Sequence, residues 1–337
     1  MKRAPCLNRR ALPLVDSPQW IIENGIGEAR ALLMQAGEVL AAKLYWPGEI
    51  VAGDIHGAIL TEKRGGARRG TVTLENGGTA LVDQLPSDLT EGANGQVRIT
   101  RAPIAERGRL KRAQSRWVGG NLPDQEAGGK GIFETGKPVP KFAASDWEEV
   151  WHAASSGTIA FAGGEILCSV TPAMTVIDID GDMPPRELAM AAIPAVVQAL
   201  HWFGIGGNVG IDFPTLQTKS DRRAVDTALA NALSGWPHES TAMNGFGFVQ
   251  LIARLEGPSL LHRFATSRTA LCARAAMRTA ERVEGAGATL ITIHPALKSK
   301  IKPEWLDELR RRTGREVRIE TDAGLALEAP HAQIVSL

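Results

Sequence analysis

The pattern of apolar and polar positions predicts a strand, a helix and a second strand within residues 174–213. Residues 175–177 and 209–211 are short apolar runs rich in β-branched side chains, which is typical of buried strands. The segment between them begins with Asp182 and two prolines and carries an apolar stripe at helical spacing, which predicts a helix. A crossover of this length predicts a right-handed unit with parallel strands. The stripe consists of Leu188, Ala192, Ala195, Ala199 and Phe203.

Each of these two predicted strands ends on an aspartate, Asp178 and Asp212. If the strands are neighbours, about 4.8 Å apart, the two carboxylates emerge side by side at the strand ends, where open α/β sheets place their chemistry. Two close carboxylates repel each other unless a cation lies between them, and Mg²⁺ is usually held by one or two carboxylates with substrate phosphates. Asp180 and Asp182 could supply further oxygen atoms. The alternative is that these acidic residues only cap helices or solvate loops.

The remaining periodicity predicts a β-rich N-terminal part and a smaller α+β part at the C-terminus. Short strands separated by turns within residues 18–118 suit a small barrel. Residues 119–145 are rich in glycine and proline and predict a linker. We therefore divide the chain into a β-rich region (1–118), the linker (119–145), an α/β catalytic subdomain with a mixed sheet (146–265) and an α+β domain (266–337). The N-terminal strands are expected at residues 20–23, 38–44, 48–51, 57–60, 70–74, 79–82 and 96–100.

Beyond the central unit, helices are expected over residues 146–154, 219–233, 267–284 and 303–312, and strands over residues 246–255, 289–294, 316–321 and 325–328. The helix over residues 219–233 is amphipathic. Its apolar face is expected to carry Val225, Leu229 and Ala232. Its polar face carries Lys219, Arg222 and Arg223, which could neutralise a phosphate near a metal or could simply be solvated.

The composition limits where in the cell the protein is expected and which kinds of metal or disulfide site it can contain. Three cysteines, Cys6, Cys168 and Cys272, form no close pair, so neither a disulfide framework nor a structural zinc site is expected. The seven histidines show no metal-ligand spacing. No apolar signal-type stretch follows the basic residues 1–10, and the uncharged residues 188–211 contain Pro194 and four glycines. A cytoplasmic protein with no membrane partner is expected.

The chain as a whole is nearly neutral, but its basic residues are concentrated in one stretch. Lys and Arg number 38 against 37 Asp and Glu, a net charge of +1, and the single tyrosine argues against an aromatic RNA-recognition platform. Between residues 98 and 116, however, only Glu106 is acidic. Such a cluster predicts phosphate contacts along an RNA strand, although a solvated face is the usual alternative. The basic residues of this stretch are Arg98, Arg101, Arg107, Arg109, Lys111, Arg112 and Arg116.

An ordered series of motifs resembles the ribonuclease E/G family over about residues 157–260. TPAMTVIDIDG at residues 171–181 is similar to the family's TEALTVIDVNSG, which carries its first catalytic aspartate. GGNVGIDF at residues 206–213 is similar to GGLIVIDFIDM, which carries the second. AGGE at residues 162–165 resembles the SGGY turn before the first strand. Downstream, RRAV, Leu229, Gly247 and GPSL at residues 257–260 follow in the family's order.

The resemblance implies a Mg²⁺-dependent endoribonuclease that hydrolyses phosphodiesters of single-stranded RNA to 5′-phosphate ends, in RNA processing or decay. It gives Asp178 and Asp212 the role of metal ligands, with Asp180 orienting the water or sharing the metal. It also implies phosphate contacts by the basic residues named above and by Arg254, which replaces a pair of arginines and stands one place out of register. The family inserts an OB-type RNA-binding barrel at the N-terminal strands, and here an abbreviated, OB-like barrel is expected.

Departures from the family pattern keep other functions open. Asp180 replaces an asparagine, Pro172 replaces a glutamate, and Pro194 falls inside the expected helix. The segment 119–145 is too short for the family's 5′-monophosphate sensor, and Cys272 alone lies near its two-cysteine zinc link. Without that zinc link, we expect either a monomer or a homo-oligomer that forms in a different way. The alternatives are an RNA-binding protein that has lost turnover and a metal-dependent phosphoesterase acting on a small nucleotide, against which the long basic stretch argues.

Overall fold

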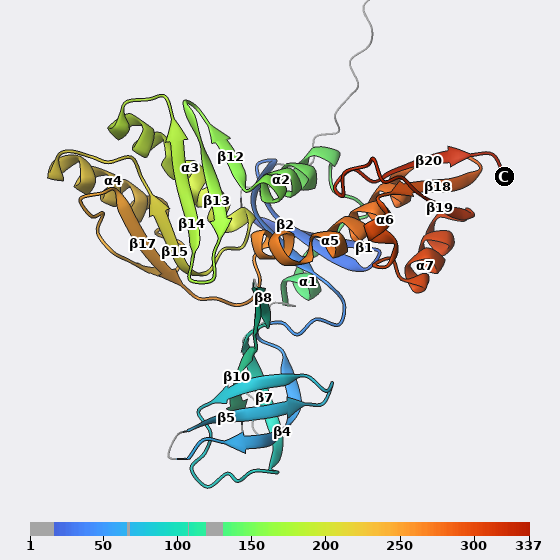
Figure 1. The fold of residues 1–337 in the computed structure, drawn as a ribbon, viewed down its shortest axis with the longest axis horizontal. Helices are drawn as coiled ribbons and strands as arrows, with labels where there is room; N and C mark the ends of the chain where they lie inside the picture. The colour runs from blue at the N-terminus through green and yellow to red at the C-terminus, as the bar shows by residue number, and fades with distance from the viewer. Residues whose placement is uncertain (1–16, 66–67, 107, 119–130) are drawn as a thin grey trace, which may run out of the picture.

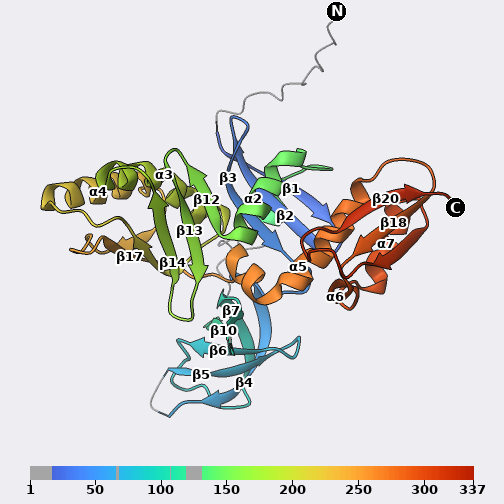
Figure 2. The ribbon, with the colours of Figure 1, turned by 45° about the horizontal axis from the view of Figure 1, so that its top comes forward.

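The computed structural model describes residues 17–65, 68–106, 108–118 and 131–337 of the chain. In Figure 1 a β-barrel lies below a central body, with the largest sheet to one side and the C-terminal sheet to the other. Figure 2 shows the same arrangement after rotation, with helix α5 crossing the middle of the molecule. Cys6 and Arg107 fall outside the described residues.

The central body begins with an antiparallel meander. β1 (Gln19–Gly25), β2 (Glu28–Gln35) and β3 (Glu38–Tyr45) pair in order, and β11 (Lys137–Pro138) lies parallel to β1. Helices α1 (Gly131–Thr135) and α2 (Ala144–Ser156) follow the barrel in the chain. Within the described residues, the meander, α2 and the sheets beyond it share one continuous hydrophobic core. The boundaries proposed at residues 118, 145 and 265 stay predictions.

The barrel is closed by five strands and has a separate small core that includes Leu60, Val72 and Ile99. Its strands, in spatial order, are β10 (Ala113–Val118), β6 (Thr79–Asp83), β5 (Arg69–Leu74), β4 (Ile55–Lys63) and β7 (Asn94–Arg101). The prediction of a small barrel in the β-rich region is confirmed. Residues 48–51 are not a strand but part of the connection from β3 into the barrel, so that expectation is wrong. A short hairpin, β8 (Ile104–Glu106) and β9 (Arg109–Lys111), projects from the barrel.

The largest sheet contains the predicted strand–helix–strand unit. Its order is β12 (Thr158–Phe161), β13 (Gly164–Val170), β14 (Thr175–Gly181), β15 (Gly207–Asp212), β17 (Phe248–Ala253) and β16 (His238–Ser240). β14 and β15 are parallel and are joined by α3 (Pro185–Trp202), which packs on one face of the sheet. The crossover prediction is confirmed. α3 also contacts α4 (Lys219–Ala232) and strand β3.

Helix α3 continues through Pro194, which falls inside the helix that the apolar stripe predicts. A proline inside a helix costs about 3 kcal/mol because it removes a backbone N–H and crowds the preceding turn. Pro194 itself is exposed, whereas Ile193, Ala195 and Val196 beside it are buried. Burial of these neighbours offsets the local cost and holds the helix together. Among the described helices, none is long and apolar enough to cross a membrane.

The C-terminal part combines a long helix with a small mixed sheet. α5 (Leu260–Arg282) starts earlier than expected, capped by Ser259, and is kinked at Ser267. Strand β18 (Ala288–Ile293) lies between β19 (Val317–Thr321) and β20 (His331–Val335), beside α6 (Pro295–Lys298) and α7 (Pro303–Thr313). The strand expected over residues 325–328 is wrong, because turns occupy those residues and the third strand is β20.

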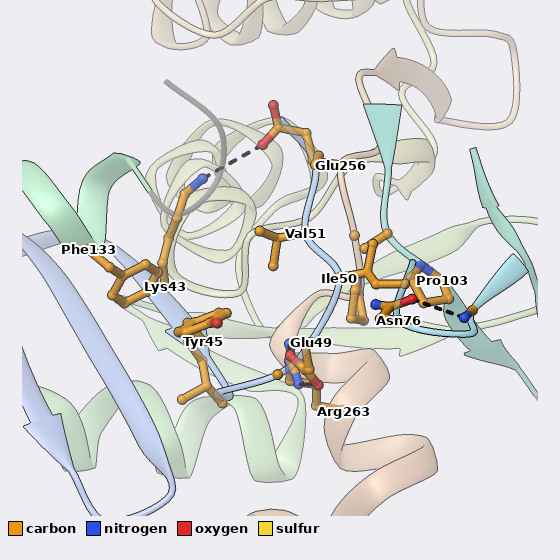
Figure 3. A pocket seen from close by; sticks show the side chains of 17 residues that line it. Lys43, Tyr45, Glu49, Ile50, Val51, Asn76, Pro103, Phe133, Glu256 and Arg263 are labelled. Carbon is orange, nitrogen blue, oxygen red and sulfur yellow. Dashed lines mark hydrogen bonds and ion pairs between the residues drawn. The ribbon is translucent and has the colours of Figure 1, made fainter. Parts of the chain in front are cut away.

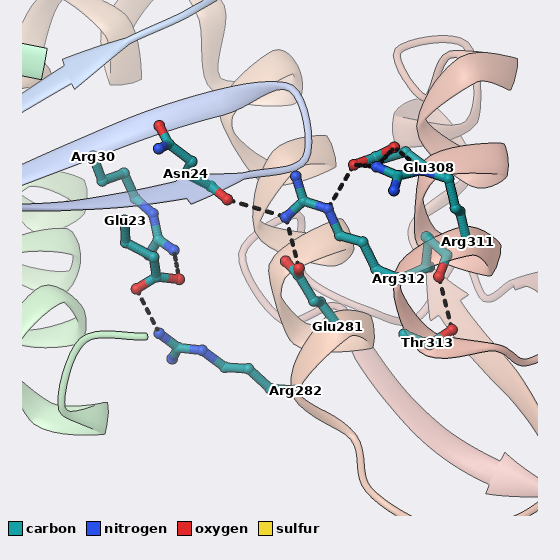
Figure 4. A network of polar contacts seen from close by, with 10 residues as sticks. Glu23, Asn24, Arg30, Glu281, Arg282, Glu308, Arg311, Arg312 and Thr313 are labelled. Atoms are coloured by element: carbon teal, nitrogen blue, oxygen red, sulfur yellow. Dashed lines mark hydrogen bonds and ion pairs between the residues drawn. The ribbon is translucent and has the colours of Figure 1, made fainter. Parts of the chain in front are cut away.

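Buried ion pairs join the meander to the C-terminal part (Figure 4). Arg30 is fully buried and pairs with Glu23 and Glu28, while Arg278 of α5 donates to Glu28 at 2.8 Å. Burial, followed by the charge of Arg278, lowers the pKa of Arg30 to about 10. Arg312 of α7 extends the network, bonding the carbonyl of Asn24 at 3.0 Å and the Glu281 carboxylate at 2.8 Å. Removing one partner from such a network leaves a buried charge without compensation, so these contacts fix the C-terminal part against the meander.

Candidate active site

Asp178 and Asp212 lie directly opposite each other on the neighbouring parallel strands β14 and β15. Adjacent strands are about 4.8 Å apart, so the two carboxylates occupy one small volume. Asp212 is the last residue of β15, as predicted, but β14 continues to Gly181, so Asp178 lies within its strand rather than at its end. The expected side-by-side placement of the two side chains is confirmed.

Both aspartates are on the face of the sheet that α3 leaves uncovered. Ile177 and Ile211, the residues before them, are fully buried toward α3, and successive side chains of a strand alternate between faces. Asp178 and Asp212 are accordingly exposed. Within the described residues, neither carboxylate has a hydrogen bond or an ion pair to the protein. Their oxygen atoms are therefore available to a ligand.

Asp180 lies two residues further along β14 on the same exposed face. One of its carboxylate oxygens accepts the backbone N–H of Gly181 at 2.9 Å, and Glu165 lies opposite it on β13. The turn at Ala162 and Gly163 joins β12 to β13, where Gly163 has a φ of +90° and a side chain would meet Met183. The antiparallel pairing of β13 with β14 places Glu165 beside Asp180 and makes the edge of the site acidic.

The donor set fits Mg²⁺ and does not fit a structural zinc site. Among the described residues, no group of three or more His, Cys, Asp or Glu side chains is placed to hold a metal ion by itself. Mg²⁺ typically takes one or two carboxylates and completes its octahedron with water and substrate phosphate oxygens. Structural zinc requires four protein ligands, mostly sulfur and nitrogen. Asp178 and Asp212 are the residues that would hold the metal.

Two exposed cations lie at the starts of the helices that follow β14 and β15 in the chain. Lys219 is the first residue of α4, which begins seven residues after Asp212 in the sequence, and it is exposed. Arg186, near the start of α3, is also exposed and pairs with Asp221 of α4 at 3.1 Å. Sequence reasoning missed Arg186, because only the packing of α3 on α4 brings the two helix starts together.

The other predicted cations of α4 have different surroundings. Arg222 is half-buried and donates to the carbonyl of Leu216 at 2.6 Å, so it holds the loop before α4. Arg223 is exposed. On the apolar face, Val225 and Leu229 are buried as expected, but Ala232 is exposed and Leu233 takes its place in the core. The buried face therefore ends at Leu233, one residue later than the sequence pattern indicated.

Arg254 is not brought to the aspartates. β17 runs antiparallel to β15, with Phe248 opposite Asp212 and Ala253 opposite Gly207. Arg254 therefore follows the far end of β17, roughly 20 Å along the sheet from Asp212 at about 3.4 Å per residue. Its nearest charged neighbour is Glu256, at 3.8 Å. A phosphate held at Asp178 and Asp212 is out of its reach.

The basic residues of the barrel fall into two groups. Arg101 donates to the carbonyl of Arg112 at 3.0 Å, and Arg109 and Lys111 both bind Glu106, so these three support the barrel and its hairpin. Arg98 is half-buried and lies opposite Arg116 on the neighbouring strand. Arg112 and Arg116 are exposed. Fewer basic side chains of the barrel are therefore available to contact RNA than the cluster in the sequence predicted.

The β8–β9 hairpin connects the barrel to the aspartate-bearing sheet. Arg109 donates to the carbonyl of Pro172, just before β14, at 3.4 Å, and β8 packs against α5. Burial acts to raise the pKa of Glu106, but hydrogen bonds and charge from Lys111 and Arg109 outweigh it and lower that pKa below its usual range. Burial also lowers the pKa of the nearby His262, whose Nδ1 is 2.8 Å from the hydroxyl of Ser259.

A cavity of about 370 Å³ lies where the barrel meets the central body (Figure 3). Tyr45 and Phe133 form one wall, with ring centres 5.7 Å apart, and Lys43 reaches Glu256 at 3.8 Å across its rim. Arg263 below it is held by both oxygens of Glu49, at 2.9 and 2.7 Å. The lining contains neither Asp178 nor Asp212. The aspartates lie on the open sheet face instead, which suits a polymer better than a small molecule.

Comparison of the chain with models of known protein families finds no match.

Proposed function

We propose that this protein is a Mg²⁺-dependent endoribonuclease that hydrolyses phosphodiester bonds of single-stranded RNA. The observation that supports this most is the alignment of Asp178 with Asp212 on adjacent parallel strands, exposed and without a protein partner among the described residues. Two like charges held this close are unfavourable by themselves and become favourable around a divalent cation. The motifs around both aspartates, which resemble those of the ribonuclease E/G family, direct the proposal to RNA.

In the proposed reaction, Asp178 and Asp212 are the residues that would hold the metal beside the scissile phosphate. Bound there, Mg²⁺ supplies charge neutralisation and an acidified water. Hydrolysis forms a bond from a water oxygen to phosphorus and breaks the bond to the 3′-oxygen, so the products carry a 5′-phosphate and a 3′-hydroxyl. Lys219 and Arg186, at the starts of α4 and α3, stabilise the negative charge that develops on the phosphate oxygens.

The rest of the substrate is proposed to run from the open sheet to the barrel. The five-stranded closed barrel is interpreted as an abbreviated OB-like module, a fold that binds single strands in a positively charged groove. Arg112 and Arg116 on its surface are the residues proposed to contact phosphates. An extended strand suits this arrangement, because its phosphates can reach both the barrel and the open sheet face.

The test is cleavage of a fluorescent single-stranded RNA by wild type, Asp178→Asn and Asp212→Asn, with Mg²⁺ or EDTA. Wild type is expected to cleave with Mg²⁺ alone, and each variant to lose at least about 100-fold in rate, the scale on which removal of one electrostatic catalytic group acts. Glu239→Gln is the matched control, since Glu239 is an exposed carboxylate on β16 of the same sheet. Undiminished Mg²⁺-dependent cleavage by Asp212→Asn would contradict the proposal.

A second candidate is an RNA-binding protein of the same fold without turnover. It is favoured by the distance of Arg254 from the aspartates and by the extra negative charge of Asp180, where the family resemblance expects an asparagine. The same experiment separates the two. Salt-dependent RNA binding that persists in EDTA, together with no cleavage in Mg²⁺, would establish the binding protein instead of the nuclease.

A further inference from the structure

Phe246 is the most exposed large apolar side chain next to the aspartate pair, with 83% of its surface open to solvent. It lies in the loop between β16 and β17, at the end of the sheet where Asp212 ends β15. Single exposed apolar residues are common on protein surfaces, so exposure alone does not indicate a role. The structure of the loop supplies the further observations.

Hydrogen bonds within the loop fix the backbone on which Phe246 is carried. The side-chain oxygen of Asn244 accepts the backbone N–H groups of Phe246 at 2.8 Å and Phe248 at 3.1 Å. Gly247 adopts a φ of +96°, and a β-carbon there would lie 2.2 Å from the carbonyl oxygen of Phe213. Glycine is therefore required at this point, where the loop backbone presses against the chain that leaves β15.

Two further hydrogen bonds attach the loop to the residues that follow Asp212. The backbone N–H of Phe213 donates to the carbonyl of Gly247 at 3.2 Å, and the hydroxyl of Thr215 donates to the carbonyl of Phe246 at 3.3 Å. Phe248, two residues later, lies directly opposite Asp212. Phe246 therefore lies in the turn two residues before the position opposite Asp212, at the same end of the sheet as the end of β15.

We propose that Phe246 is a stacking platform for an unpaired nucleobase adjacent to the scissile phosphodiester. This inference rests on the proposed function, because it assigns one subsite of the same RNA. A rigid aromatic ring accepts the face of any base, so the contact adds affinity without strong sequence preference. A base inside a duplex has both faces covered by its neighbours. Phe246 therefore selects for single-stranded RNA beside the aspartates.

The experiment measures binding of a short fluorescent RNA by anisotropy in EDTA, which removes the proposed metal and with it cleavage. Phe246→Ala is expected to weaken binding by about 5- to 150-fold, the range found for loss of one base–aromatic stack, and Phe246→Trp to restore it. Ile252→Ala is the matched control, because Ile252 is 48% exposed on the same sheet but lies near the opposite end of β17.

An abasic scan then distinguishes stacking from a structural effect. A single abasic nucleotide is moved along the RNA, and wild type is expected to lose affinity when it falls next to the cleaved bond. Phe246→Ala is expected to lose nothing further at that position, since the ring that contacts the base is already absent. A loss of equal size in both proteins would overturn the inference.

The outcomes separate this inference from the proposed function. If Phe246→Ala binds RNA as wild type does while cleavage still requires Mg²⁺ and Asp212, the stacking platform is wrong and the nuclease stands. If wild type neither binds nor cleaves single-stranded RNA, the proposed function fails and the inference fails with it. If binding depends on Phe246 but no cleavage occurs, the inference holds for an RNA-binding protein.

Discussion

At the scale of single residues, Asp178 and Asp212 lie directly opposite each other, and among the described residues no cation is bonded to either carboxylate. Glu106 binds Arg109 and Lys111, and Glu308 binds Arg311 and Arg312. The aligned aspartates have no such partner within the described residues, although like charges directly opposite each other destabilise a sheet. An arrangement that costs stability without a contact in return is typical of functional sites.

Asp180 provides a sharp test at this scale, because it shares the face of Asp178 but lies beyond the aligned pair. Asp180→Asn should leave the maximal cleavage rate nearly unchanged and raise the Mg²⁺ concentration for half-maximal rate about two- to tenfold, since one unit charge several ångströms from a divalent ion contributes about 1 kcal/mol in water. Asparagine can still accept the N–H of Gly181, so the fold is preserved. Rates across a Mg²⁺ titration check this. A collapse as large as that of Asp178→Asn would make Asp180 a direct ligand.

Sequence reasoning located the aspartate pair but not the residues around it. The pair could be predicted because strand, crossover helix and strand have one preferred handedness and neighbouring placement. Arg186 and Phe246 could not be predicted, because their relation to the site depends on how α3 meets α4 and how a loop folds back on Phe213. Arg254 was assigned to the site by its sequence distance from a motif, and the antiparallel direction of β17 carries it away.

At the scale of elements, the sequence predicted best those elements whose partners are local. The helix at residues 219–233 was predicted close to its limits because its apolar periodicity is a local signal, and in the structure Thr218 caps its start. Strand β2, EARALLMQ, was missed because its residues favour a helix and two of them, Glu28 and Arg30, are charged. They are buried as strand residues by ion pairs with Glu23 and with Arg278, 250 positions away from Glu28 in the sequence. Long-range charge pairing of this kind leaves no local pattern.

The β8–β9 hairpin should make the protein sensitive to acid. The pKa of Glu106 is lowered from 4.5 in the folded state, so its contribution to stability is complete above pH 4.5 and is lost as the pH falls through the folded value. Burial lowers the pKa of His262 from 6.5, so its contribution is likewise present above pH 6.5 and lost below it. Glu106→Gln should lower the free energy of unfolding at pH 7 by about 1–2 kcal/mol, the scale of a hydrogen bond to a charged group.

Urea unfolding from pH 7 downward measures both effects. Wild type should lose stability first through His262 and then, below pH 4.5, through Glu106, whereas Glu106→Gln should lack the second loss. Glu316→Gln is the matched control, because Glu316 also pairs with an arginine, Arg318, but on the exposed surface. Parallel acid profiles for wild type and Glu106→Gln would show that the hairpin does not carry the acid sensitivity.

At the scale of the whole molecule, the barrel has a hydrophobic core of its own but is still bonded to the central body. Its core is separate from the continuous core of the rest of the described chain, and Figure 2 shows it projecting from the central body. The β8–β9 hairpin nevertheless ties it to Pro172, which lies in the turn just before β14 and six residues before Asp178 in the sequence. Under the proposed function, an RNA strand held by the barrel would reach the aspartates within a few nucleotides, and shorter substrates would not use both surfaces.

Variants of Arg112 and Arg116 test whether the barrel binds the RNA backbone while the aspartates carry out cleavage. Replacing both with alanine should weaken binding of a long single-stranded RNA and reduce the slope of log affinity against log salt by about 1.4, since each lost phosphate contact on a single strand removes about 0.7. RNAs too short to reach the barrel should be cleaved at the wild-type rate, because the aspartate site is untouched. Arg310→Ala with Arg311→Ala is the control, as both arginines are exposed on α7 in the C-terminal part. An unchanged salt slope for the barrel variant would show that the barrel does not hold the RNA backbone, and that the substrate is bound by the central sheet alone.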